Sequence, residues 1–213
     1  MKLKYVTDLN FQDVVDQYNV RVEMSSRLIS LLNKNREKEY IGLALGMDDI
    51  HGNYSARDHD LGPRILTARS SNTVFALAKQ IQTVEDCLDL QHLIYEANIP
   101  YLKISVGTEI ALMLQPSVHW VANSRSIWSH LLVKHRSIGK AKEELKLYRD
   151  GFDNSEMAYK LWCAIHTDMH ANVCLLSELG TTTAIEQGVE PGEDDYLWAD
   201  AVSNALYERH IGA

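Results

Sequence analysis

The segment 104–124 constrains the fold of this chain most, because it carries one formal charge, Glu109, in twenty-one residues. A run of this kind is expected in the interior of a folded domain. A buried carboxylate costs free energy unless an ion pair or hydrogen bonds compensate for it. We therefore expect Glu109 to lie in a buried helix over 101–114, next to a charged or imidazole partner.

The length and the charge of the chain limit its class. Its 213 residues suffice for one domain with a sizeable core. The formal net charge of -8 argues against a broad nucleic-acid surface and against attraction to anionic lipid. Pro116 and polar residues such as Gln115 make a membrane span over 104–124 unfavourable. We therefore predict a single helical domain over 1–213, with no membrane contact and with nucleic acid unfavoured as a partner.

The cysteines indicate a reducing compartment. The three cysteines, Cys87, Cys163 and Cys174, form no Cys-x-x-Cys pair. Neither a disulfide framework nor a cysteine-rich zinc site is expected from this pattern. The N-terminus also lacks the apolar region of a secretory signal. These features predict a cytoplasmic protein with reduced thiols.

Apolar periodicity and capping residues predict a mainly α-helical bundle of about eight helices. A short N-terminal strand over 2–6 is also possible, since Leu3 and Tyr5 share one face at period two. The expected helices cover about 8–35, 70–82, 83–99, 101–114, 118–135, 139–148, 153–180 and 193–209. The last of these is expected to pack through its apolar face.

Two histidines of the predicted helix 153–180 are candidate metal ligands. His166 and His170 are four residues apart, the spacing at which one helix presents two imidazoles to a single metal ion. The intervening residues lack the glutamate of zinc-protease helices, which excludes that mechanism. The alternative is that both histidines are partly buried and hydrogen-bonded to neighbours. Two histidines alone do not define a metal site.

The candidates for catalysis are Glu109, His119 and His130. On the predicted helix 118–135, His119, Asn123 and His130 would share one face, which could meet Glu109 across a short turn. Glu109 could then ligate a metal or transfer protons, with His119 and His130 beside it. A buried Glu–Arg or Glu–His bridge is the alternative, with Arg125 as a possible partner.

Asn123 and Arg125 are candidates for cofactor binding. Asn123-Ser-Arg125, leading into Ile-Trp-Ser-His-Leu-Leu-Val-Lys, resembles the Asn-x-Arg helix of flavin-dependent thymidylate synthases. The signature of that family is Arg-His-Arg-x-x-Ser, and Lys134-His135-Arg136 is followed here by Ser, Ile and Gly. Gly139 stands at the position where the signature requires serine, so the chain is not assigned to that family.

The segment 48–63 is predicted to be the least regular part of the chain. Glycine and proline punctuate it, and its composition is that of a metal-binding loop. His59-Asp60 resembles the His-Asp pair of HD-type phosphohydrolases, but that family places the pair within a helix. We expect an acidic, solvated loop.

Two functional hypotheses follow. In the first, the chain is a metal-dependent, hydrolase-like enzyme that acts on a small polar or nucleotide-like substrate. A divalent metal held by His166, His170 and Glu109 would activate water. In the alternative, the chain is a non-catalytic helical protein that forms a homo-oligomer or binds a partner, and its histidines are structural.

Overall fold

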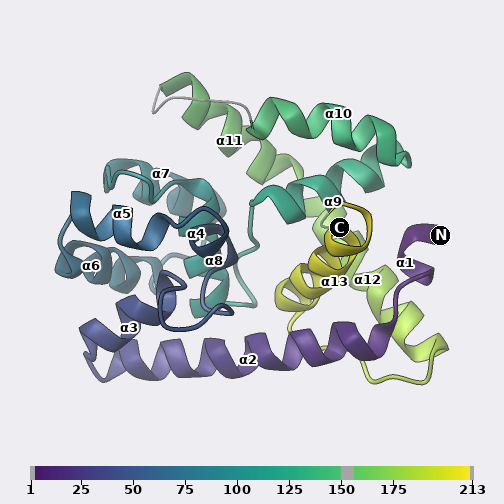
Figure 1. Cartoon of the computed structure of the whole chain (residues 1–213), viewed down its shortest axis with the longest axis horizontal. Helices are drawn as coiled ribbons and strands as arrows, with labels where there is room; N and C mark the ends of the chain where they lie inside the picture. The colour runs from purple at the N-terminus through teal and green to yellow at the C-terminus, as the bar shows by residue number, and fades with distance from the viewer. Residues whose placement is uncertain (1–2, 150–155, 212–213) are drawn as a thin grey trace. The chain divides into compact units, whose positions relative to one another are not determined.

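The computed structural model describes residues 3–149 and 156–211, and within these ranges the chain is helical throughout (Figure 1). The helices are α1 (Lys4–Thr7), α2 (Phe11–Asn33), α3 (Glu37–Ala44), α4 (Tyr54–Asp58), α5 (Leu61–Ala68), α6 (Ser71–Ile81), α7 (Cys87–Glu96), α8 (Ile104–Leu114), α9 (Ser124–His135), α10 (Ile138–Arg149), α11 (Glu156–Asp168), α12 (His170–Glu186) and α13 (Asp195–His210). The mainly helical class is confirmed. The predicted number of about eight is wrong, because the described residues form thirteen helices.

The short strand predicted over 2–6 is also wrong in the part that the structure describes. The helix α1 occupies Lys4–Thr7 instead. Leu3, Val6 and Leu9 are all buried, and they recur every three residues rather than every two. The spacing of the buried residues is therefore that of a helical turn, and the period-two pattern of Leu3 and Tyr5 was misleading.

The chain divides into two compact units. Unit 1 comprises Met1–Asn19 and Ser124–Ala213, and unit 2 comprises Val20–Asn123. The long helix α2 begins in unit 1 and ends in unit 2. The prediction of a single domain over 1–213 stays a prediction.

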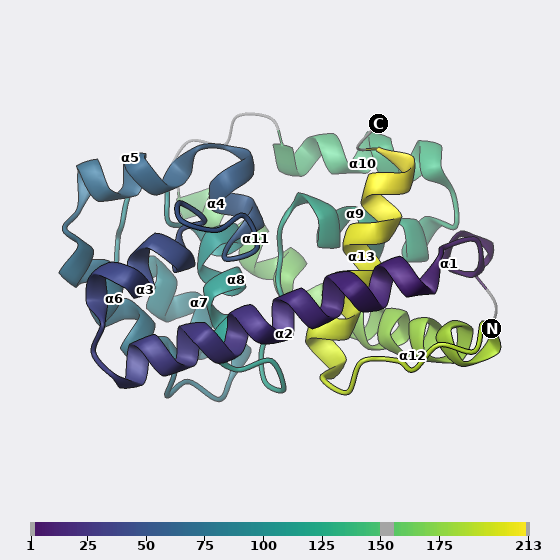
Figure 2. The same cartoon turned by 60° about the horizontal axis from the view of Figure 1, so that its bottom comes forward.

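In unit 2, α8 packs against α4, α6 and α7 (Figure 2). Every residue of α8 from Val106 to Leu114 is buried, as the apolar run predicts. A Cβ added at Gly107 would lie 2.7 Å from Ile94 Cδ1, so glycine permits the close approach of α7.

No helix in the described ranges is long and apolar enough to cross a membrane.

In unit 1, α13 packs against α9 and α12, and α10 packs on α9. Trp128 of α9 and Trp198 of α13 are fully buried. Leu197, Val202 and Leu206 are buried too, so the predicted docking of the last helix through its apolar face is confirmed for these residues.

The helix predicted over 118–135 begins later, at Ser124. Val118 and His119 make one turn of backbone bonds to Gln115, and tertiary hydrogen bonds hold the segment beyond that turn. The amide of Ala122 donates to Thr108 Oγ1 at 3.0 Å, and the imidazole of His119 contacts the carbonyl of Val84. The expectation that His119, Asn123 and His130 share one helix face is therefore wrong.

The helix predicted over 153–180 is interrupted at Met169, where α11 ends and α12 begins. Residues 153–155, its predicted start, lie outside the described residues. The amide of Asn172 donates to the carbonyl of Met169 at 3.0 Å, an i→i−3 bond that tightens this turn. Met169 itself is fully buried, so the chain is anchored in the core at the interruption.

Candidate functional site

Glu109 of α8 is fully buried, as its apolar surroundings predict. The only charged partner within reach among the described ion pairs is Arg21 of α2, whose Nη2 lies 3.2 Å from Glu109 Oε1. Arg21 is itself 1% exposed. The pair is therefore almost completely removed from water, where an ion pair depends on further hydrogen bonds to offset its desolvation.

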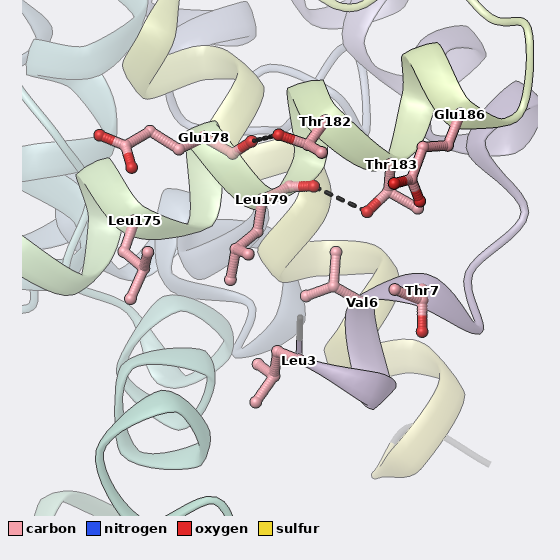
Figure 3. Close-up of a pocket in the computed structure, with 9 residues that line it drawn as sticks. All are labelled: Leu3, Val6, Thr7, Leu175, Glu178, Leu179, Thr182, Thr183 and Glu186. Carbon is pink, nitrogen blue, oxygen red and sulfur yellow. Dashed lines mark hydrogen bonds between the residues drawn. The ribbon is translucent and has the colours of Figure 1, made fainter. Parts of the chain in front are cut away.

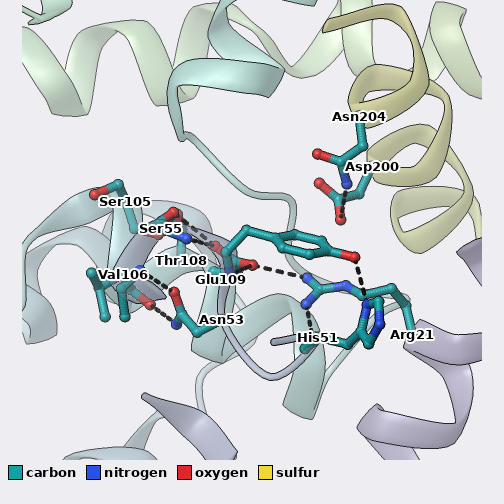
Figure 4. A network of polar contacts seen from close by, with 12 residues as sticks. Arg21, His51, Asn53, Ser55, Ser105, Val106, Thr108, Glu109, Asp200 and Asn204 are labelled. Carbon is teal, nitrogen blue, oxygen red and sulfur yellow. Dashed lines mark hydrogen bonds and ion pairs between the residues drawn. The ribbon is translucent and has the colours of Figure 1, made fainter. Parts of the chain in front are cut away.

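Those further hydrogen bonds come from the start of α4 (Figure 4). The amide of Tyr54 donates to Glu109 Oε1 at 2.7 Å. The amide and the hydroxyl of Ser55 donate to Oε2 at 3.0 Å and 2.7 Å. Asn53 caps the same helix, accepting a bond from the amide of Ala56 at 2.9 Å. Both oxygens of the carboxylate are thus occupied by donors, and the first amides of α4 are satisfied by Glu109 and Asn53.

Arg21 connects this carboxylate to the loop before α4. Its Nη1 donates to the carbonyl of His51 at 2.6 Å, and its guanidinium carbon lies 4.7 Å from the centroid of the Tyr54 ring. His51 Nδ1 lies 3.0 Å from the hydroxyl of Tyr54. Arg21, Glu109 and the segment 51–55 therefore form one buried network, which we call the Glu109 network. Its geometry suits holding α2, α4 and α8 together.

The segment 48–63 was predicted to be a solvated acidic loop, and this prediction is wrong for its central part. Asn53, Tyr54 and Ser55 are buried and supply donors to the Glu109 network. His59 and Asp60 lie between α4 and α5, outside that network.

His119 lies in the loop before α9 and is fully buried. Its Nε2 is 3.0 Å from the carbonyl of Val84, so Nε2 carries the proton. Burial lowers the pKa of His119, and Asp86 opposes this shift in part. The neutral imidazole thus ties the loop 115–123 to the connection between α6 and α7.

His130 of α9 is a buried histidine of unit 1. Its Nδ1 lies 3.1 Å from Nδ2 of Asn172, which donates to it. Burial, with the positive charge of Lys134 as the next cause, lowers the pKa of His130 to about 4. The imidazole is therefore neutral at neutral pH and is held by an amide.

Asn123 and Arg125, the candidates for cofactor binding, flank the start of α9. Asn123 is buried, 4% exposed. Arg125 Nη1 lies 2.8 Å from Glu208 Oε1 on α13, so the ion pair that the structure gives Glu109 is with Arg21 and not with Arg125. Binding of a cofactor by Asn123 and Arg125 stays a prediction.

His166 and His170 belong to different helices, α11 and α12, so they do not project from one continuous helix. His166 is fully buried, whereas His170 is exposed. The Nε2 of His170 lies 2.9 Å from the hydroxyl of Tyr196 and 3.5 Å from Cys174 Sγ. Burial raises the pKa of the Cys174 thiol, with Asp195 and Glu178 adding to the effect, which disfavours the thiolate.

The predicted site residues are thus distributed over both units. Glu109, His119 and Asn123 belong to unit 2, and Arg125, His130, His166 and His170 belong to unit 1. Among the residues that the structure describes, no three His, Cys, Asp or Glu side chains converge as metal ligands do. A shared metal centre of Glu109, His166 and His170 stays a prediction.

Arg21 was not predicted as the partner of Glu109. It occupies a position in the apolar stripe of α2, between Tyr18 and Ser25 and in line with Val14 and Leu28. All five are buried. An arginine in a buried stripe, like a glutamate in an apolar run, needs a partner, and matching these two charges would have identified the pair.

Comparison with known protein families, with curated proteins and with solved structures gives no match for this chain.

Proposed function

We propose that this chain is a non-catalytic helical protein that associates with a second copy of itself, and that its buried polar residues are structural. The observation that carries the proposal is an exposed apolar stripe on α11. Met157, Leu161 and Ala164 are spaced four and three residues apart, and they therefore share one side of the helix. Met157 is 75% exposed, Ala164 is exposed and Leu161 is half-buried.

The stripe adjoins the face with which α11 packs in its own unit. The buried Ala158 and Ile165 lie about a quarter of a turn from the centre of the stripe, and the buried His166 lies on the opposite side of the helix. Leu147, on the adjoining α10, is 60% exposed. The rings of Tyr148 and Trp162 are in contact at a centroid distance of 6.2 Å, so α10 and α11 meet beside these residues. Exposed apolar side chains that share one side of a helix are typical of a protein–protein contact surface.

The charges beside the stripe favour a second copy as the occupant. Glu156 and Lys160 form an ion pair at 2.7 Å along the edge of the stripe. In a two-fold pairing Glu156 of one copy can meet Lys160 of the other, and the reverse, so this edge is complementary to itself. The short stripe predicts a weak dimer rather than an obligate one.

The non-catalytic part of the proposal is supported by the hydrogen bonding of the candidate catalytic residues. Glu109 accepts bonds on both oxygens, His119 is held by the carbonyl of Val84 and His130 by Asn172. Each imidazole or carboxylate therefore already has an intramolecular partner. The metal-dependent enzyme with a small polar or nucleotide-like substrate remains the competing hypothesis.

Sedimentation velocity over a range of protein concentrations tests self-association. We expect the wild-type protein to shift from monomer to dimer as the concentration rises, and Met157→Glu to remain monomeric. Ile185→Glu is the matched control, because Ile185 of α12 is 63% exposed and lies outside the stripe. A monomer at every concentration, or equal effects of the two substitutions, would contradict the proposal.

Thermal unfolding with added divalent metal tests the competing hypothesis. We expect zinc, manganese, iron and nickel to leave the melting temperature of the wild-type protein unchanged. Saturation of a specific site at a hundredfold its Kd would stabilise the fold by about 2.7 kcal/mol. Stabilisation that is lost when His166 and His170 are both replaced by Ala would support the hypothesis of a metal-dependent enzyme instead.

A further inference from the structure

We propose that the cavity between α1 and α12 in unit 1 binds a linear aliphatic amine with an ammonium group at each end. This inference is independent of the self-association described above. The cavity has a volume of about 230 Å³. Its lining residues are Leu3, Val6, Thr7, Leu175, Glu178, Leu179, Thr182, Thr183 and Glu186 (Figure 3).

The floor of the cavity is apolar. Leu3, Val6 and Leu179 line it with 6%, 0% and 8% of their surface exposed, and Leu175 adds a half-buried side chain. Methylene groups that cover such a floor are removed from water, which favours binding. The floor therefore favours a ligand with an alkyl body.

The polar groups of the lining are hydrogen-bond acceptors. The hydroxyls of Thr7, Thr182 and Thr183 donate to backbone carbonyls of their own helices, at 2.9 Å, 2.9 Å and 2.8 Å. With their protons engaged, these hydroxyls offer lone pairs alone. Glu178 and Glu186 add two carboxylates, and no Lys, Arg or His occurs among the described lining residues. A ligand that matches this lining must donate hydrogen bonds and carry positive charge, which excludes phosphates and carboxylates.

The spacing of the two carboxylates favours a linear ligand with two charged ends. Glu178, Thr182 and Glu186 follow each other at intervals of four residues on α12. The rise of an α-helix places the first and the last of these about 12 Å apart along the axis. In Figure 3, Glu178 and Glu186 stand at opposite ends of this row, with Leu179 and Thr183 between them. An extended diamine can lay its methylene chain along the floor and place an ammonium group at each end.

The proposal is tested by measuring the binding of octane-1,8-diamine to the full chain by calorimetry at low salt. Octane-1,8-diol and octanedioate are the matched probes, with the same length and no charge or negative charge. We expect the diamine alone to bind, and to bind more weakly as salt is added. Chemical-shift changes of backbone amides should be confined to α1 and α12.

Three substitutions in the cavity and two control substitutions locate the site. Glu178→Gln and Glu186→Gln should each weaken binding of the diamine about twofold to fivefold, the range expected for exposed ion pairs. Glu190→Gln removes the same charge from an exposed position outside the cavity and should leave the affinity unchanged. Thr183→Met should fill the cavity and abolish binding, whereas Thr183→Val keeps its shape and should preserve most of the affinity.

Equal binding of the diol, or equal weakening by all three Glu→Gln substitutions, would overturn the proposal. Shift changes spread over acidic surfaces elsewhere would do so too, since they would indicate general attraction to a protein of net charge -8. If Thr183→Met does not fold, the two cavity glutamates and their control still decide the question.

Discussion

The two units stabilise a central buried polar residue in different ways. In unit 2, the carboxylate of Glu109 is matched by the guanidinium of Arg21 and by amides of α4. In unit 1, His130 is neutral and is held by the amide of Asn172. Removing one partner of a buried charge pair lowers the stability of the fold. A buried neutral histidine lowers the stability of the fold when acid protonates its ring. The two units should therefore respond differently to mutation and to pH.

The largest expected effect is on the charge pair of unit 2. Glu109→Leu leaves Arg21 buried without its counter-charge and removes the acceptor for the amides of Tyr54 and Ser55. We expect a loss of about 3–5 kcal/mol in the free energy of unfolding, measured by urea denaturation. Glu109→Gln retains one acceptor and should lose less.

A double substitution separates the ion pair from the other contacts. Glu109→Leu combined with Arg21→Met should cost less than the sum of the two single changes, because no charge is then left unpaired. The exposed pair Arg36–Glu39, 58% and 51% exposed, is the matched control. Glu39→Leu should cost at most about 1 kcal/mol. Additive effects at Glu109 and Arg21 would show that the pair is not coupled.

The next effect is the acid sensitivity of unit 1. The pKa of His130 is lowered to about 4 in the folded protein, below the value of about 6.5 expected for an unfolded chain. The unfolded chain therefore binds the proton first as the pH falls. The contribution of neutral His130 to stability is complete above pH 6.5 and is lost between about pH 6.5 and 4, by at most roughly 3 kcal/mol.

His130→Asn tests this linkage, because it retains an acceptor for Asn172 and removes the titrating group. The titratable groups near His130 are Lys134, Asp168, Glu144 and His135. They remain in the variant, so the difference between the two pH profiles isolates His130. His92→Asn is the control, since His92 is 69% exposed and paired with Glu96. A variant with the pH profile of the wild-type protein would refute the assignment.

A smaller effect distinguishes the helix contacts of the two units. A Cβ at Gly180 in unit 1 would lie 2.7 Å from Val202 Cγ2 and 3.0 Å from Trp198 Nε1. At Gly107 in unit 2, the facing atoms belong to the more flexible side chain of Ile94. We expect Gly180→Ala to destabilise by about 1–3 kcal/mol and Gly107→Ala by less. Gly139→Ala, with no atom within 4 Å of the added carbon, should be neutral or stabilising in thermal unfolding.

The smallest effect concerns Arg125, which pairs with the 53% exposed Glu208. Glu208→Gln should change the free energy of unfolding by about 0.2–1 kcal/mol, and less at high salt. A loss of stability as large as that of Glu109→Leu would contradict the expectation that the buried Arg21–Glu109 pair matters more to stability than the Arg125–Glu208 pair.

The sequence predicts the helical class and the burial of Glu109 because both depend on local pattern. An isolated carboxylate in an apolar run can be recognised without knowing the fold. The partner of Glu109 could not be recognised in the same way. Arg21 lies 88 residues away, and Arg125 is closer in sequence, so proximity along the chain favoured the wrong arginine.

The errors in helix boundaries have the same origin. The turn at Met169 and the non-helical segment before Ser124 depend on contacts made elsewhere in the fold, such as the bond from Ala122 to Thr108. Helical periodicity continues through both places in the sequence. The face shared by His119 and His130, and the helix shared by His166 and His170, were inferred from that periodicity and depended on boundaries that tertiary contacts changed.

The passage of α2 from one unit into the other has a consequence for biosynthesis. Unit 2 is continuous in sequence, Val20–Asn123, whereas unit 1 needs both Met1–Asn19 and Ser124–Ala213. On the ribosome, unit 2 can complete its contacts while most of unit 1 is still to be translated. Phe11 and Tyr18 meanwhile remain without Trp198, the ring that both contact in the finished protein. The C-terminal part of α2 can thus be packed in unit 2 before α13, which covers the N-terminal part of α2, has been synthesised.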